Sequence, residues 1–208
     1  MQILVVSATV LELAPFLAIN KPVDHIITGV GSPACMYGLL KKIRNNCYDL
    51  IIQAGIAGSF DPLYPPGKTV LVEKDVFADV GVMETAEFQN IFELGFADQN
   101  ETPYSEGWLV NNNSLLTSLD LPVVNGITVN MINDDKRFTN QYLHKYNPVV
   151  ESMEGAALHY VCLQEKINFL QLRTISNEVG ERDKSKWKMK DAIENLNKEL
   201  LLIIEKLS

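Results

Sequence analysis

The sequence has few cysteines, no long apolar run and no excess of positive charge, and each lack argues against a class of protein. Its three cysteines are odd in number and far apart, so neither a disulfide framework nor a CxxC motif is present. The apolar run at the N-terminus is short and follows no basic segment, unlike a signal peptide or membrane span. A net charge of −8 argues against nucleic-acid or anionic membrane surfaces as partners. These features predict a cytoplasmic protein.

What the sequence does contain is an alternation of strand-like and helical segments over 208 residues. A content of 47% hydrophobic and 21% charged residues is typical of a globular protein, and the length suits one domain, residues 1–208. The alternation predicts a three-layer α/β/α fold around a central, mixed and twisted sheet. Strands are expected at 2–6, 25–28, 50–53, 69–82, 121–130 and 168–175, and helices after Thr9, at about 33–45, at 134–145, from 155 and at 186–206. The polar segment 84–107 is expected to be a lid or a subunit contact.

Polar groups follow two of the apolar runs, at the carboxyl ends where open α/β sheets bind ligands. In the first junction, Glu151 and Glu154 flank Met153. The second junction brings Asn177, and Glu12 lies in the first turns of the helix after the first strand. Each side chain has a structural interpretation, as a helix cap, an exposed helix residue or core, beside a functional one.

Two turns of small residues follow other strands. Residues 29–34 satisfy a loose GxGxxA pattern, which is typical of dinucleotide binding. The acidic residue of such sites should end the next strand, but Asp49 precedes that strand, which argues against a nicotinamide or flavin cofactor. Residues 54–59 are interpreted as a loop that lets backbone N–H groups approach a ligand closely.

Five segments occur in the order and spacing of the nucleoside phosphorylase and nucleosidase superfamily, which the chain resembles over nearly its whole length. They are 1–12, 29–31, 54–58, the SMEGAA run at 152–157 and the RTISN run at 173–177. The chain looks most like the 5′-methylthioadenosine/S-adenosylhomocysteine nucleosidase branch. Within that branch, residues 176–183 and Trp187 resemble futalosine hydrolases, which release hypoxanthine from futalosine in an alternative menaquinone pathway. The resemblance implies a nucleoside phosphorylase-like fold, N-glycosidic bond hydrolysis without metal or cofactor, and a homodimer or larger homo-oligomer.

The resemblance also assigns roles to single residues. Glu12 would accept a proton from the attacking water. Glu154 would hold the ribose hydroxyls, because an ionised carboxylate can only accept hydrogen bonds. Met153 would pack on the face of the sugar. Met131 and Ile132, at the end of an earlier strand, are assigned to substrate binding.

Asn177 departs from nucleosidases that act on adenine nucleosides, which have an aspartate at this position. An amide cannot act as a general acid, but it can donate to O6 of a purine and accept from a protonated N7. This chemistry matches a 6-oxopurine and favours hypoxanthine over adenine. The N7 proton would then come from solvent or from a group that the sequence does not identify.

The sequence has only four arginines, which bears on the choice between water and phosphate. None falls in 7–12 or 54–59, where the resemblance would place phosphate, so water is the expected nucleophile. Arg182 either pairs with the benzoate group of futalosine or caps the loop after Asn177. The aromatic candidates for the 5′-extension pocket are Phe60, Phe77 and Trp187.

Three other functions are considered. A methylthioadenosine-type nucleosidase is disfavoured by Asn177, and a purine nucleoside phosphorylase is disfavoured by the position of the arginines. A nucleoside-binding module without catalysis is disfavoured by the presence of both Glu12 and Glu154.

Overall fold

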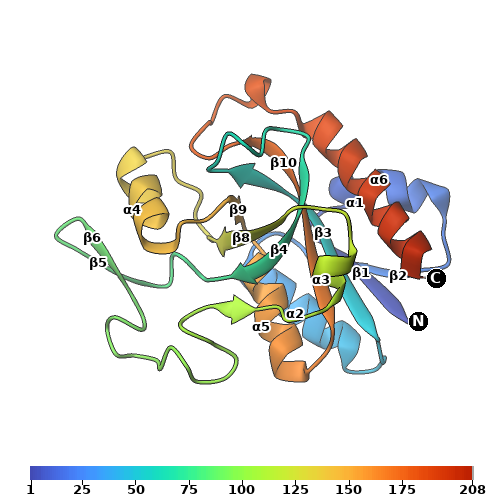
Figure 1. The fold of residues 1–208 in the computed structure, drawn as a ribbon, viewed down its shortest axis with the longest axis horizontal. Coiled ribbons are helices and arrows are strands. Elements are labelled where there is room, and N and C mark those ends of the chain that lie inside the picture. The colour runs from blue at the N-terminus through green and yellow to red at the C-terminus, as the bar shows by residue number, and fades with distance from the viewer. Residues whose placement is uncertain (208) are drawn as a thin grey trace.

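The computed structural model describes residues 1–207 and shows a mixed sheet with helices on both faces (Figure 1). The order of strands in the sheet is β10-β4-β8-β9-β3-β1-β2, with β7 at the edge of β4 and a further pairing of β10 with β3. The elements are β1 (Ile3–Ser7), α1 (Val10–Ile19), β2 (Asp24–Ile27), α2 (Ser32–Ile43), β3 (Leu50–Ser59), β4 (Thr69–Asp75), β5 (Gly81–Glu84), β6 (Glu87–Asn90), β7 (Leu109–Val110), α3 (Leu115–Ser118), β8 (Val123–Thr128), α4 (Lys136–Tyr146), β9 (Val150–Ser152), α5 (Gly155–Glu165), β10 (Phe169–Glu178), η1 (Lys184–Lys186) and α6 (Met189–Leu207).

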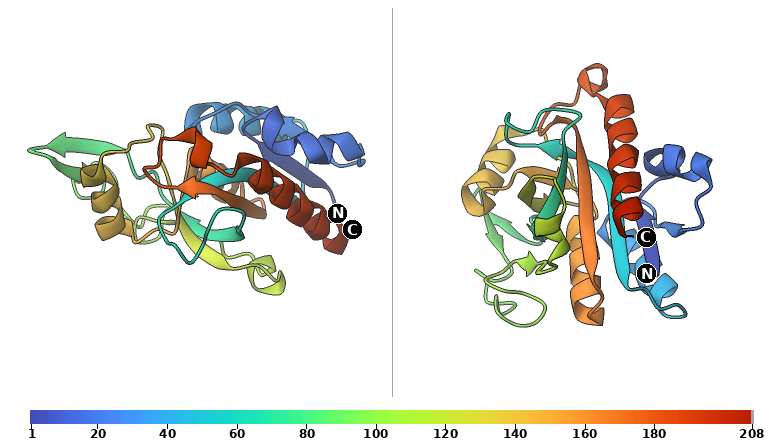
Figure 2. Two further views of the ribbon diagram at one scale, coloured as in Figure 1. Left: turned by 90° about the horizontal axis from the view of Figure 1, so that it is seen from above. Right: turned by 45° about the vertical axis from the view of Figure 1, so that its right-hand side comes forward.

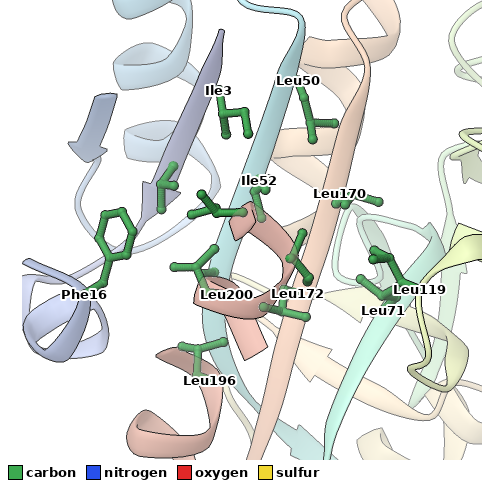
Figure 3. Close-up of a cluster of buried hydrophobic side chains, with 14 of the residues drawn as sticks. Ile3, Phe16, Leu50, Ile52, Leu71, Leu119, Leu170, Leu172, Leu196 and Leu200 are labelled. Atoms are coloured by element: carbon green, nitrogen blue, oxygen red, sulfur yellow. The ribbon is translucent and has the colours of Figure 1, made fainter. Parts of the chain in front are cut away.

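Both faces of the sheet are apolar. Successive side chains of a strand point to opposite faces, so a continuous apolar run supplies apolar side chains to each face. In β1, Ile3 and Val5 belong to a core cluster with helices α1 and α6, whereas Leu4 and Val6 belong to a second cluster with α2 and α5. Figure 3 shows the first cluster, which joins Leu196 and Leu200 of α6 with Ile3 of β1, Ile52 of β3 and Leu172 of β10. The three-layer α/β/α prediction is confirmed.

The long strand β3 changes partner along one edge. Its first residues, 50–53, pair with β1, and its last two, 58–59, pair with β9. The opposite edge pairs with β10 over nearly the whole length of β3. Residues 54–57 therefore have an open edge between β1 and β9. Such a switch point is where open α/β sheets bind ligands.

Several predicted boundaries are wrong. Residues 54–59 are not a loop but the second half of β3, because pairing with β10 continues through the small residues. The strand expected at 69–82 ends at Asp75, and the strand expected to end at Ile175 continues to Glu178. Asn177 therefore lies within a strand and not after one.

The segment 84–107 contains part of a two-stranded hairpin, β5–β6, that extends beyond α4 (Figures 1 and 2). Gln141 of α4 accepts the Phe88 N–H at 2.9 Å and donates to the Ala86 carbonyl at 2.9 Å. The segment contributes no described residue to the cavity considered below. Within residues 1–207, no helix is long and apolar enough to cross a bilayer.

Candidate active site

A cavity of about 260 Å³ opens at the free edge of β3, lined by residues at the ends of β1, β9 and β10. Six of the seven residues predicted for the site line it: Glu12, Ile132, Met153, Glu154, Asn177 and Arg182. Met131 does not. It is 60% exposed, and its backbone N–H donates to Asp79 at 3.3 Å. The structure therefore brings together all of these residues except Met131.

Glu12 is both a helix cap and part of the cavity wall. Its Oε2 accepts the Thr9 N–H at 3.0 Å and the Thr9 hydroxyl at 2.7 Å, within a capping box at the start of α1. The Ser7 hydroxyl donates to the same oxygen at 3.3 Å. Oε1 accepts the Ile56 N–H at 3.1 Å, from the open edge of β3. Glu12 is only 7% exposed, so it is not the exposed helix residue of the structural alternative.

Glu154 directly precedes α5, yet its side chain does not cap that helix. Its Oε1 instead accepts the Gly31 N–H at 2.8 Å. The glycine turn considered for a dinucleotide thus holds a carboxylate of the site, and Gly31 has a φ of 92°, which L residues rarely adopt. Burial raises the pKa of Glu154, while the positive charge of Arg173 and the Gly31 hydrogen bond oppose that rise.

Arg173 on β10 lies close to the cavity without lining it, and no role is assigned to it from the sequence. Its guanidinium is buried and donates to the Gln53 side chain. A Cβ on Gly55 would lie 2.1 Å from Nη1 of Arg173 and 3.2 Å from Oε1 of Glu12, so glycine there admits both side chains. An arginine inside an apolar strand was the available signal, because a buried charge needs a counter-charge. Arg173 is remote from 54–59 in sequence but adjacent to it in space.

Asn177 faces the cavity because β10 has an irregularity in its pairing with β3 just before it. Its Oδ1 accepts the Ser176 hydroxyl at 2.7 Å, and its Nδ2 donates to the Glu178 carbonyl at 2.7 Å. An amide has two N–H donors and two lone pairs on oxygen. One donor and one acceptor of Asn177 therefore remain for a ligand.

A buried polar chain fixes the start of α5. Asp75 accepts the Thr128 hydroxyl at 2.9 Å and the Gln171 amide at 3.0 Å. The Thr128 hydroxyl in turn accepts the Ala156 N–H at 2.7 Å. A Cβ on Gly155 would lie 2.2 Å from Asp75 and from Gln171, so only glycine fits there. The chain ties β4, β8 and β10 to the helix that follows the Met-Glu pair of the site.

The aromatic candidates occupy different places. Trp187 lines the cavity, and its indole N–H donates to the Glu181 carbonyl at 2.9 Å. The guanidinium carbon of Arg182 lies 5.9 Å from the Trp187 ring centre. Phe60 instead packs beside a core cluster with β8 and α4, and Phe77 faces a tyrosine ring of α5 at 6.3 Å. Neither of these two phenylalanines lines the cavity.

Carboxylates are frequent in the wall, but they do not form a metal site. Glu151 and Glu181 line the cavity together with Glu12 and Glu154. Across residues 1–207, no group of three or more His, Cys, Asp or Glu side chains is placed to hold a metal ion. In the sequence, Glu151 stands out only as one of the two carboxylates that flank Met153. Glu151 directly follows the apolar pair Val149-Val150, and this position was the signal that it is buried.

Comparisons with known proteins agree on family and fold. Residues 19–206 match the family model described as "Phosphorylase superfamily". The futalosine hydrolase of Thermus thermophilus is 27% identical over 175 residues, which cover 83% of this chain and 76% of that protein. The structure of a futalosine hydrolase of Helicobacter pylori superposes with a TM-score of 0.81 at 15% identity, covering 98% of this chain and 97% of that chain. A 5′-methylthioadenosine/S-adenosylhomocysteine nucleosidase of Helicobacter pylori gives the same values. The structural matches show the shared fold.

Proposed function

The chain belongs to the phosphorylase superfamily, and on that premise we propose that it hydrolyses the N-glycosidic bond of futalosine. The products would be hypoxanthine and dehypoxanthinyl futalosine, within menaquinone biosynthesis. The observation that carries the proposal is the convergence of Glu12 and Glu154 on one cavity, with Arg173 buried beside them. The sequence relatives named futalosine hydrolases support the choice of substrate.

Glu12 is the base of the proposed reaction. Three donors occupy Oε2, whereas Oε1 accepts only the Ile56 N–H and retains a lone pair. A water molecule hydrogen-bonded to Oε1 loses its proton to this carboxylate as its oxygen bonds to C1′ of the ribose. The C1′–N9 bond breaks, and its electron pair leaves with the purine.

Glu154 is the proposed partner of the ribose hydroxyls. Its Oε1 takes the Gly31 N–H, and the Met153 N–H also interacts with the carboxylate. The carboxylate has further lone pairs, which can accept the 2′ and 3′ hydroxyls. Burial raises the pKa of Glu154, and the positive charge of Arg173 opposes this rise in favour of the ionised, acceptor-only form. A buried carboxylate beside the sugar also stabilises the positive charge that develops on the ribose.

Asn177 is proposed to bind the leaving base. Its remaining N–H would donate to O6 of hypoxanthine. After solvent has supplied a proton to N7 of the leaving base, the remaining Oδ1 lone pair would accept from this N7–H. Arg182 beside Trp187, at the cavity wall, suits the benzoate carboxylate of the 5′ extension.

Charge in the cavity favours water over phosphate. A phosphate dianion would meet the buried carboxylates Glu12 and Glu154. Arg173 does not line the cavity; its guanidinium donates to Gln53, and its positive charge acts on Glu154. A neutral nucleophile carries no such electrostatic penalty.

The proposal is tested by chromatography of free bases released in phosphate-free buffer from futalosine, inosine and 5′-methylthioadenosine in parallel. Hypoxanthine from futalosine alone is the expected result. Adenine from 5′-methylthioadenosine would instead assign the chain to the adenine nucleosidases. Release that begins only when phosphate is added would make the protein a phosphorylase.

A further inference from the structure

Asn197 is a buried polar residue of α6 to which the proposed reaction gives no role. It is 1% exposed, and the other buried residues of this helix are apolar. Helix α6 packs against α1, the helix that carries Glu12 (Figure 1). Because burying an amide among apolar side chains is unfavourable unless it is hydrogen-bonded, the partners of Asn197 indicate what it does there.

The partners of Asn197 in α1 are two backbone groups, one of them from Glu12 itself. Its Nδ2 donates to the Glu12 carbonyl at 2.8 Å, and its Oδ1 accepts the Phe16 N–H at 3.1 Å. Nδ2 also donates to the Ile193 carbonyl at 2.7 Å, within α6. In a regular α-helix the N–H of Phe16 would be directed at the carbonyl of Glu12. The amide therefore bridges the two groups that a regular helix would join to each other.

The sequence of α1 weakens this helix beside Glu12. Pro15 lies in the interior of α1, beyond the first turn where proline is tolerated. A proline there has no N–H to donate, and its ring crowds the carbonyl four residues earlier, so it favours a bend. Helices also bend where a side chain inserts into the ladder of helical hydrogen bonds. Pro15 and Asn197 therefore act on the same turn, which the proline loosens and the amide holds in one geometry.

Glu12 is held at both ends by groups from outside its own helix. Asn197 holds its backbone carbonyl, and the Ile56 N–H of β3 holds Oε1 of its carboxylate at 3.1 Å. Helix α6 is in turn tied to β10, because the Lys188 N–H just before α6 donates to the Ser176 carbonyl at 2.8 Å. Ser176 and Glu12 both line the cavity. Helix α6 therefore connects two parts of the cavity wall that are distant in the chain.

We propose that Asn197 is a positioning residue for Glu12, which it holds in place by clamping the backbone of α1. The inference rests on the proposed function, because it takes Glu12 to be the base that activates water. A general base must lie within hydrogen-bond reach of the proton that it takes. A displacement of about 1 Å can lower a rate by about 10²-fold. Loss of the clamp would let α1 relax and would move the carboxylate away from the water.

The first test replaces Asn197 by leucine, which has a similar size and cannot form the hydrogen bonds. The Glu12 carbonyl and the Phe16 N–H can then bond to each other, so the fold is retained while Glu12 moves. We expect kcat for futalosine to fall by about tenfold or more, with hypoxanthine binding unchanged in calorimetry. Asn197→Ala, which leaves a space instead of an apolar group, should act in the same direction.

Leu200→Ala is the matched control, because it truncates a buried side chain on the next turn of α6, within the core cluster that also contains Phe16. It should lower stability in urea and leave kcat at the wild-type value. Loss of kcat in Leu200→Ala to the same extent as in Asn197→Leu would overturn the inference, because any weakening of α6 would then suffice.

A double-mutant cycle separates positioning from a general loss of structure. In a Glu12→Gln background, Asn197→Leu should change kcat by less than about twofold, because its effect acts through the carboxylate. Equal fold losses in both backgrounds would show that Asn197 acts by another route. Wild-type kcat in Asn197→Leu would refute the positioning role directly.

A measurement without turnover keeps this inference separate from the proposed function. In protein labelled with carbon-13 at the glutamate carboxyl carbon, the NMR resonance missing from Glu12→Gln identifies Glu12. Asn197→Leu and Asn197→Ala should shift this resonance, whereas Leu200→Ala should not. An unmoved resonance would refute the role of Asn197, whatever the protein hydrolyses.

The two proposals can therefore fail separately. Turnover of 5′-methylthioadenosine in place of futalosine refutes the proposed substrate alone, and the kinetic comparison is then made on that nucleoside. A shifted Glu12 resonance in a protein that hydrolyses no nucleoside would support the contact between Asn197 and Glu12 and refute the proposed function.

Discussion

At the scale of single residues, the site depends on which hydrogen bonds each polar group has already made. Oε2 of Glu12 is filled by donors from Ser7 and Thr9, while Oε1 keeps room for one more. The Asn177 amide likewise accepts one hydrogen bond from Ser176 and donates one to Glu178. The groups left over are an acceptor for water and a donor–acceptor pair for a base.

Replacing Asn177 by aspartate is expected to shift the choice of base toward adenine. A protonated aspartate donates to N7, and its other oxygen accepts from the 6-amino group, whereas the amide suits O6. The ratio of kcat/KM for 5′-methylthioadenosine to that for futalosine should rise by at least about tenfold. Steady-state kinetics on both substrates check this. Asn140→Asp, on an exposed position of α4, is the control for added charge. An unchanged ratio in Asn177→Asp would show that position 177 does not read the base.

At the scale of elements, the start of α5 is held by buried groups that never touch the cavity. The Thr128 hydroxyl accepts the Ala156 N–H and donates a hydrogen bond to Asp75. Gly155 lies where any side chain would collide with this chain of hydrogen bonds. The position of Glu154, one residue earlier, follows from that packing.

Gly155→Ala is therefore expected to destabilise the fold, although alanine favours a helix over glycine. The added Cβ would lie 2.2 Å from both Asp75 and Gln171, and overpacking of this kind costs roughly 1–3 kcal/mol. Urea denaturation measures the loss. Gly95→Ala is the control, because no atom lies within 4 Å of its added Cβ and only a φ of 70° opposes it. Equal stability of Gly155→Ala and wild type would contradict the described packing.

At the scale of the whole molecule, the polar centre makes stability depend on pH. Burial raises the pKa of Asp75 to about 6 from its usual 3.8, against the opposing hydrogen bonds of Gln171 and Thr128. Between these two values the folded protein holds a proton that the unfolded chain releases. Folding therefore becomes less favourable as the pH rises through that window.

The free energy of unfolding of the wild type, minus that of Asp75→Asn, is expected to fall by roughly 2 kcal/mol between about pH 4 and about pH 6. It should level off about one pH unit above the upper value, where Asp75 is ionised in both states. The difference removes the effects of other titrating groups, such as His159, whose pKa burial lowers to about 4. Denaturation at a series of pH values gives both curves. If the free energies of unfolding of the wild type and Asp75→Asn changed in parallel with pH, the pKa of Asp75 would not be raised in the folded protein.

The sequence predicts the layers of this fold better than the ends of its elements. Apolar runs with clear boundaries, such as β1, were predicted to within a residue or two. Residues 54–59 were missed because small side chains suggest a turn, while pairing with β10 and the packing of Arg173 on Gly55 make them a strand. The end of β4 was missed because an alternating pattern continues past Asp75.

In the candidate site, too, some residues could be predicted from the sequence and others could not. Glu12, Glu154 and Asn177 could be named because they stand in motifs, and all three line the cavity. Arg173 and Glu151 could not be given roles, because their importance comes from neighbours that are distant in the chain. Met131 was placed by position alone, and the structure turns it away from the cavity wall.

The measurement that most directly tests the central claim compares turnover and product binding in Glu12→Gln. The amide keeps the size of the side chain but cannot take a proton from water. We expect kcat for futalosine to fall by about 10²-fold or more, while hypoxanthine binds as in the wild type. Glu194→Gln, exposed on α6, is the control and should match the wild type in both. Undiminished turnover in Glu12→Gln would contradict the assignment of Glu12 as the base that activates water.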